Sequence, residues 1–185
     1  MLRIILCSSV LALSAAHAAT PKPTSPYVGQ ETRDIKALSA QDVADTLAGK
    51  GMGFAKAAEL NGYPGPTHVL ALAAQLELTA EQKAGTEALF RDMQARAVAL
   101  GKQLVAEERV LDRLFAARTV TADGLERALA RIAKLRGQLR QAHLAAHLVQ
   151  TDLLRPAQVE RYNALRGYTK GAGQGAGQHG AHRNH

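Results

Sequence analysis

The sequence predicts an all-α protein built around one long antiparallel helical hairpin. Two observations lead to this fold class. The chain is rich in Ala, Leu, Arg, Glu and Gln, a composition typical of long helices. Apolar residues also recur at three- and four-residue spacing along two long segments, which a short turn separates. No segment carries the alternating pattern of a strand.

The first 18 residues have the pattern of a cleaved signal peptide. Arg3 supplies a positive charge, Ile4 to Leu13 form an apolar run, and Ala16-His17-Ala18 is a small-x-small cleavage site. The alternative, a membrane anchor, needs about 20 apolar residues. We therefore expect cleavage after Ala18, export to the periplasm, and a proline-rich linker over 19–34. The single cysteine, Cys7, would leave with the signal.

Charge and composition limit the partners of the exported chain. The net charge of +7 falls to +6 once Arg3 is removed, which leaves anionic lipid, lipopolysaccharide or acidic unfolded chains as candidates. Export excludes nucleic acid. The absence of Trp and an aromatic content of 4% also leave no surface on which bases could stack.

Capping residues predict three short helices before the hairpin. Ser39 and Asp42 make a capping box for a helix that ends at Gly49-Lys50-Gly51. A second short helix spans Phe54 to Leu60. Pro66 is suited to the first position of a third helix, which runs to about Leu76.

Thr79 and Gln82 form another capping box and open the first long helix, which ends near 117–119. Its apolar stripe comprises Phe90, Met93, Ala97, Leu100, Leu104, Leu111 and Leu114. Glu107 interrupts this stripe, and the hairpin geometry places it opposite Arg131, where a structural ion pair is expected.

Thr121 caps the second long helix. Its stripe comprises Leu125, Ala128, Ile132, Leu135, Leu139, Ala142, Ala146, Val149 and Leu153. Matching stripes and a short turn predict the antiparallel hairpin, within a helical domain over 35–168. Pro156 begins a last short helix to about Arg166. Residues 169–185 contain Gly, Gln, Ala and His without apolar periodicity, so we expect a disordered tail.

No enzymatic motif has the context that it needs. Residues 175–180 fit G-x-G-x-x-G by letter, but a dinucleotide site requires a strand before the motif and a helix after it. No P-loop, G-x-S-x-G or H-E-x-x-H occurs. We expect a non-enzymatic protein.

Two histidines have the spacing of metal ligands. His143 and His147, four residues apart on a helix, can share one transition-metal ion. The hairpin register makes Asp92 and Met93 the most natural further ligands, with His68 a more distant candidate. The alternative is a metal-free pair beside the apolar stripe, because Ala142 and Ala146 hold the stripe positions.

The tail and the second long helix supply two further candidate sites. His179, His182 and His185 could hold Zn, Cu or Ni weakly, with no obligatory cofactor, or could simply form a polar terminus. A mixed basic and apolar surface could capture partly unfolded chains. Its residues are Arg131, Arg136, Arg140, Leu144 and Leu148.

The stretch Leu78-Thr79-Ala80-Glu81-Gln82 resembles the LTxxQ family of periplasmic stress proteins, the Spy/CpxP chaperones and their heavy-metal-sensing relatives. A second copy, Leu154-Arg155-Pro156-Ala157-Gln158, keeps Leu, Pro and Gln but has Arg155 where Thr is expected. The segments GMGFAKAAELNGYPGPTHVL, HLAAHL and RYNALRGY extend the resemblance over most of residues 27–168.

The resemblance implies a curved antiparallel homodimer that holds unfolded envelope proteins without ATP. It also implies metal binding through helix His, Met and carboxylate side chains. We therefore expect an ATP-independent periplasmic chaperone with metal-binding capacity. The alternative is a metal sensor or resistance protein that signals to a membrane-bound partner.

Overall fold

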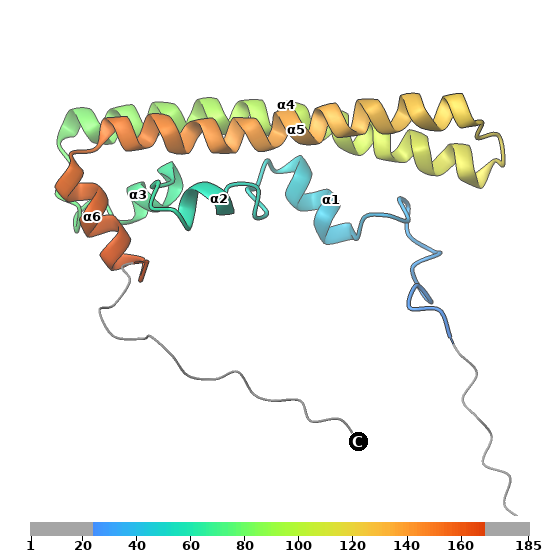
Figure 1. Ribbon diagram of the computed structural model, residues 1–185, viewed down its shortest axis with the longest axis horizontal. Helices are drawn as coiled ribbons and strands as arrows, with labels where there is room; N and C mark the ends of the chain where they lie inside the picture. Colours follow the sequence, from blue (N-terminus) through green and yellow to red (C-terminus); the bar gives the residue numbers. More distant parts are fainter. Residues whose placement is uncertain (1–23, 169–185) are drawn as a thin grey trace, which may run out of the picture. The chain divides into compact units, whose positions relative to one another are not determined.

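The computed structural model describes residues 24–168, and within this range it contains helices and turns but no strand. The elements are α1 (Ala40–Leu47), α2 (Lys56–Glu59), α3 (Pro66–Ala71), α4 (Ala80–Ala116), α5 (Ala122–Leu153) and α6 (Pro156–Leu165) (Figure 1). The all-α prediction is confirmed. None of the described helices is long and apolar enough to cross a membrane.

Residues 24–31 form a unit of their own, separate from the unit that begins at Thr32. They make tight turns, with the Val28 amide donating to the Ser25 carbonyl at 3.2 Å. The folded unit starts before the expected linker ends at residue 34, because Asp34 pairs with Arg109 at 2.8 Å and Ile35 is buried. The expected signal peptide and histidine tail lie outside the described residues.

Helices α4 and α5 run side by side as the antiparallel hairpin (Figure 1). Thr79 and Gln82 cap the start of α4, and Thr121 caps the start of α5 through the Gly124 amide. The connection between them contains Arg118 at a φ of 55°. The buried core between the two helices consists of Ala97, Leu104, Ile132, Leu135 and Leu139.

The short helix α1 packs against α4 at a glycine. A Cβ atom at Gly101 would overlap the carbonyl oxygen of Thr46, so only glycine allows the end of α1 to approach this closely. The Gln94 side chain of α4 also donates to the carbonyl of Ala48. The end of α1 therefore lies directly against α4.

The two family-like motifs meet where the open end of the hairpin joins α6. Gln82 donates to the side chain of Gln158 at 2.8 Å, and Gln158 donates back to Gln82 at 3.0 Å. Arg155 stands where Thr is expected, at the start of α6. Its backbone amide still donates a capping hydrogen bond to Gln158 Oε1 at 2.9 Å. A second buried cluster surrounds this junction and contains Val69, Leu76, Leu154 and Tyr162.

The apolar stripe of α5 differs from the expected one beyond Leu139. Val149 is 47% exposed, whereas His143 and His147 are 4% and 7% exposed. The two histidines, expected beside the stripe, are part of the buried face of α5, because residues 48–66 cover that side of the helix. A helix with neighbours on two sides buries a wider face than a two-helix pattern predicts.

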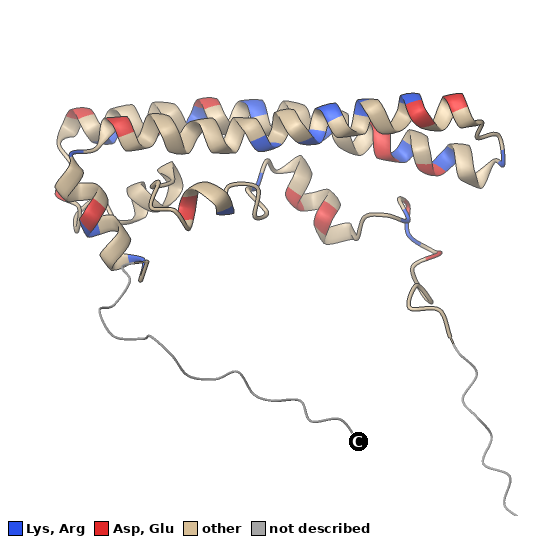
Figure 2. Ribbon diagram, viewed as in Figure 1, with Lys and Arg blue, Asp and Glu red and all other residues tan. Residues whose placement is uncertain are grey.

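Charged residues of both signs occur along the hairpin (Figure 2). The predicted pair between Glu107 and Arg131 is present at 2.8 Å. The neighbouring Glu108 is more deeply buried, and it pairs with Arg136 at 2.6 Å. Two of the basic side chains expected to face clients therefore make ion pairs within the hairpin.

Candidate functional site

Two cavities lie along the hairpin. The histidine cavity, about 680 Å³, lies between the hairpin and the segment that covers it. It is lined by Ala48–Gly53, Ala55, Lys56, Glu59, Gly65–His68, Phe90, Met93, Gln94, His143 and His147. The hairpin groove, about 580 Å³, follows the line between α4 and α5. Met93 lines both cavities.

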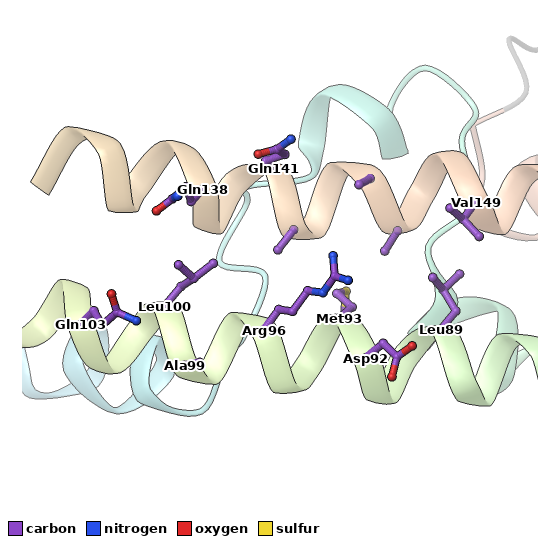
Figure 3. Close-up of a pocket in the computed structure, with 13 residues that line it drawn as sticks. Leu89, Asp92, Met93, Arg96, Ala99, Leu100, Gln103, Gln138, Gln141 and Val149 are labelled. Atoms are coloured by element: carbon purple, nitrogen blue, oxygen red, sulfur yellow. The ribbon is translucent and has the colours of Figure 1, made fainter. Parts of the chain in front are cut away.

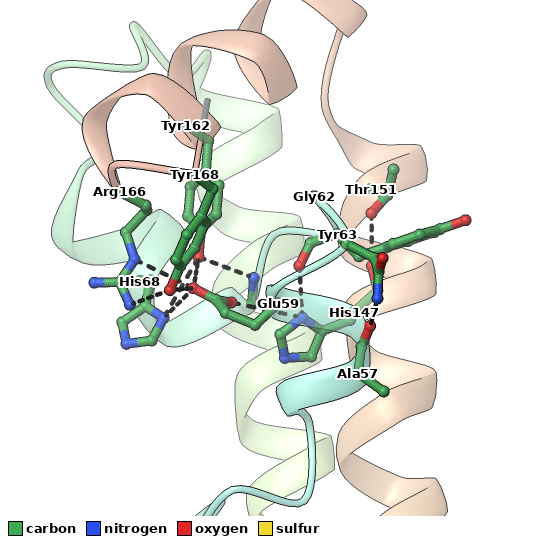
Figure 4. Close-up of polar contacts among 12 residues, drawn as sticks. Ala57, Glu59, Gly62, Tyr63, His68, His147, Thr151, Tyr162, Arg166 and Tyr168 are labelled. Atoms are coloured by element: carbon green, nitrogen blue, oxygen red, sulfur yellow. Dashed lines mark hydrogen bonds and ion pairs between the residues drawn. The ribbon is translucent and has the colours of Figure 1, made fainter. Parts of the chain in front are cut away.

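His147 is held in one tautomer by the covering segment. Its Nδ1 lies 2.8 Å from the carbonyl oxygen of Tyr63 (Figure 4). Because a carbonyl only accepts, neutral His147 must carry its proton on Nδ1, and its Nε2 keeps a free lone pair. Histidines that bind metals are commonly oriented in this way, by a backbone carbonyl on the other ring nitrogen.

His143 is buried one turn earlier on α5. Its ring stacks on Phe54, with the centroids 6.0 Å apart, and its Nε2 has no hydrogen-bond partner among the described residues. Burial lowers the pKa of His143, and the neighbouring His147 lowers it further. Both effects favour the neutral imidazole, which is the form that can coordinate a metal.

Glu59 on α2 is the central residue of the site, and the sequence analysis did not single it out. Its Oε1 accepts hydrogen bonds from Tyr162 at 2.7 Å, Arg166 at 3.2 Å and Tyr168 at 3.2 Å, and lies 3.3 Å from His68 Nδ1 (Figure 4). Its Oε2 is buried and accepts no hydrogen bond from the described residues.

The second oxygen of Glu59 lies on the side of His147. Oε2 lies 3.9 Å from His147 Nδ1. A Cβ atom at Gly65 would lie 3.0 Å from His147 Nε2 and 3.5 Å from Glu59 Oε2. Because Gly65 has no side chain, the His147 ring can pack closely against its backbone, next to Glu59 Oε2.

These donors fit a transition-metal ion in their chemistry. Imidazole nitrogen and carboxylate oxygen are ligands of Zn²⁺, and imidazole also suits Cu and Ni. Glu59 Oε2 and His143 Nε2 are both buried and find no hydrogen-bond partner in the described part of the chain, which costs free energy unless a further group satisfies them. Within residues 24–168, however, no three His, Cys, Asp or Glu side chains already surround a metal position, so an ion would have to draw them together.

The predicted ligands do not all lie together. Met93 lines the histidine cavity together with His143 and His147. His68 on α3 also lines it, and its Nδ1 lies 3.3 Å from Glu59 Oε1. Asp92 lines the hairpin groove instead. Asp92 is exposed and does not line the histidine cavity, because adjacent positions on a helix point to different sides and Met93 is the one that faces the histidines.

The hairpin groove has an apolar floor and a polar rim (Figure 3). Leu89, Met93, Leu100, Val149 and several alanines form the floor; Asp92, Arg96, Gln103, Gln138 and Gln141 form the rim. None of the residues expected to bind clients lines it. Arg131 and Arg136 are in ion pairs, Arg140 and Leu148 are exposed elsewhere on α5, and Leu144 is half-buried.

Glu59 carried no usable signal in the sequence. It lies 84 or more positions before His143 and His147. The segment around it has no repeating apolar spacing from which its packing could be predicted. The glycines and prolines around it indicated turns, but not that these turns would fold over the hairpin.

Comparison of the chain with protein-family models, with curated proteins and with solved structures finds no match in any of the three. The resemblance to the LTxxQ family therefore stays a prediction that rests on the motifs.

Proposed function

We propose that this chain is an exported, non-enzymatic protein of the Spy/CpxP type, which holds partly unfolded envelope proteins without ATP. The observation that supports this proposal is the hairpin groove. It offers an apolar floor that is open to solvent, and exposed apolar surface of this kind in a folded protein favours interaction with another chain.

The chemistry of the groove suits a client that is not defined by sequence. The floor contains Met93, whose flexible side chain adapts to different shapes. The rim carries one cation, one anion and three amides, so it offers hydrogen bonds without selecting strongly by charge. Binding would then depend on exposed apolar segments, which unfolded proteins share.

A charge placed in the groove tests this proposal. Ala145 lines the groove and is exposed, so Ala145→Glu should weaken suppression of the aggregation of a denatured client. Ala133→Glu is the matched control, because it adds the same charge at an exposed position of α5 outside both cavities. Equal activity of the two variants would contradict the role of the groove.

A second candidate function is metal binding, as part of this role or as a periplasmic sensor. The observation that favours it is that Glu59, His143 and His147 line one cavity, in which Glu59 Oε2 and His143 Nε2 are buried without a hydrogen-bond partner among the described residues. We propose that Glu59, His143 and His147 hold Zn, Cu or Ni, with Met93 at the cavity wall. Asp92 has no part in this site.

Metal titration separates this site from the histidine tail. In full-length protein with His179, His182 and His185 changed to Asn, zinc binding should weaken strongly in His143→Ala, His147→Ala and Glu59→Gln. Asp92→Asn, the control, should bind as the parent does. If all variants bind equally, metal binding does not belong to the cavity. Client holding without metal favours the chaperone; tight metal binding without client holding favours the sensor.

A further inference from the structure

We propose that α6 belongs functionally to the histidine cavity: Tyr162 positions Glu59 for a bound cation, and cation binding in turn stabilises the docking of α6. This inference rests on the metal-binding function proposed above. It assigns a role to a helix that contributes no ligand, and it predicts how occupancy of the cavity would be communicated to the C-terminal part of the chain.

The carboxylate of Glu59 divides its two oxygens between two parts of the molecule. Oε1 faces the C-terminal segment, where Tyr162 and Arg166 donate to it at 2.7 and 3.2 Å. Oε2 lies on the side of His147, 3.9 Å from its Nδ1, and receives no hydrogen bond from residues 24–168. One rigid group thus joins α6 to the cavity.

Tyr162 is well placed to fix this carboxylate. Its side chain is fully buried, in the cluster with Val69, Leu76 and Leu154. Its hydroxyl donates to Glu59, and the amide of Gly65 approaches the same hydroxyl at 3.5 Å. Gly65 is the residue whose missing side chain lets His147 and Glu59 approach the same stretch of backbone. Tyr162 therefore contacts two residues that shape the proposed site.

The C-terminal segment has two opposite effects on the affinity for a cation: Tyr162 orients the Glu59 carboxylate, whereas Arg166 repels the cation. Arg166 would repel a cation at Oε2, but its side chain is 32% exposed, so solvent screens its charge. Tyr162 donates from a fully buried position and adds no net charge. Loss of a hydrogen bond that orients a metal ligand commonly costs 10–100-fold in affinity. The orienting contact should therefore prevail, which makes the coupling favourable.

Coupling of this kind is reciprocal. If docked α6 raises the affinity for zinc, zinc must stabilise docked α6 by the same factor. Amide hydrogen exchange in residues 156–165 reports the opening of α6 directly. Zinc should therefore slow exchange there, although none of the proposed ligands lies in that helix.

The test compares two Tyr→Phe variants in the full-length protein whose tail histidines are changed to Asn. Tyr162→Phe removes the hydroxyl that donates to Glu59 and keeps the ring; we expect zinc affinity to fall about 10–100-fold. Tyr27→Phe is the control, because it removes the hydroxyl of an exposed tyrosine that does not line the cavity, and it should leave affinity unchanged. Zinc should slow exchange in α6 of the parent protein but not of Glu59→Gln.

The outcomes separate this inference from the function on which it rests. If the parent protein binds no zinc, the proposed metal function fails and the coupling fails with it. If it binds zinc through the cavity while Tyr162→Phe binds equally well, only the coupling is overturned. If Tyr162→Phe does not fold, hydrogen exchange in the parent protein tests the coupling by itself. Zinc binding without slower exchange in α6 then overturns the coupling. A purely structural Tyr162 would alter exchange equally with and without zinc.

Discussion

Glycines inside the two long helices illustrate how residue-level effects depend on neighbours. Gly101 in α4 faces the carbonyl of Thr46, whereas Gly137 in α5 has no heavy atom within 4 Å of an added Cβ. Glycine weakens any helix relative to alanine, because its unfolded backbone is freer. At Gly101 that cost is offset by close packing of α1; at Gly137 nothing offsets it.

Substituting each glycine by alanine should therefore change stability in opposite directions. Gly137→Ala should raise the free energy of unfolding by about 0.5–1 kcal/mol through helix propensity. Gly101→Ala should lower it, because the new methyl group displaces α1 from α4. Urea unfolding of both variants measures this, and stabilisation by Gly101→Ala would contradict the observed approach of α1.

The buried imidazole of His143 predicts a dependence of stability on pH. Burial, and then His147, holds its pKa below the ordinary 6.5 in the folded state. The unfolded chain therefore takes up the proton first as the pH falls. The stability that neutral His143 contributes is present above pH 6.5 and is lost as the pH falls through the lower folded pKa.

Urea unfolding at pH 7.5 and pH 5, in the presence of a chelator, tests this prediction. The parent protein should lose stability between the two values, and His143→Leu should lose less, because it has no proton to gain at this position. An equal loss in both proteins would show that His143 does not cause the pH dependence.

At the scale of elements, the hairpin depends on the contact between α4 and α5. Isolated helices are marginal in water, and most helical stability in proteins comes from packing an apolar face. Leu139 is 1% exposed within the core, whereas Leu148, nine positions later on the same helix, is 55% exposed. The two leucines thus provide a matched comparison of core and surface.

Leu139→Ala should lower the free energy of unfolding by about 2–5 kcal/mol, because it leaves a cavity between the helices. Leu148→Ala should change it by less than about 0.5 kcal/mol. Thermal or urea unfolding of the two variants distinguishes the cases. Similar values for both would mean that α5 packs against α4 through a different face.

At the scale of the whole molecule, the hairpin exposes apolar residues that a second copy could cover. Leu129, Leu148 and Val149 are each about half exposed, at 48%, 55% and 47%. The expected homodimer predicts that sedimentation equilibrium of the exported protein gives twice the chain mass and dissociates on dilution. A monomer at all accessible concentrations would contradict the dimer.

The sequence by itself determined the helical class, the helix starts and the hairpin, because these features depend on local signals. Ser39, Thr79, Thr121 and Pro156 mark helix starts through hydrogen bonds or backbone angles within a few residues. The pairing of Glu107 with Arg131 followed from counting residues on either side of one short turn.

Only the tertiary structure decided what covers the hairpin, and with it the composition of the site. Residues 48–66 fold over α5, bury His143 and His147, and bring Glu59 to them from more than 80 positions away. Asp92 was expected beside the histidines because counting from the turn places it opposite His147 along the hairpin. Such counting does not show which side of the hairpin a third segment covers. That side is fixed by long-range contacts such as Tyr162 with Glu59, which no periodic pattern records.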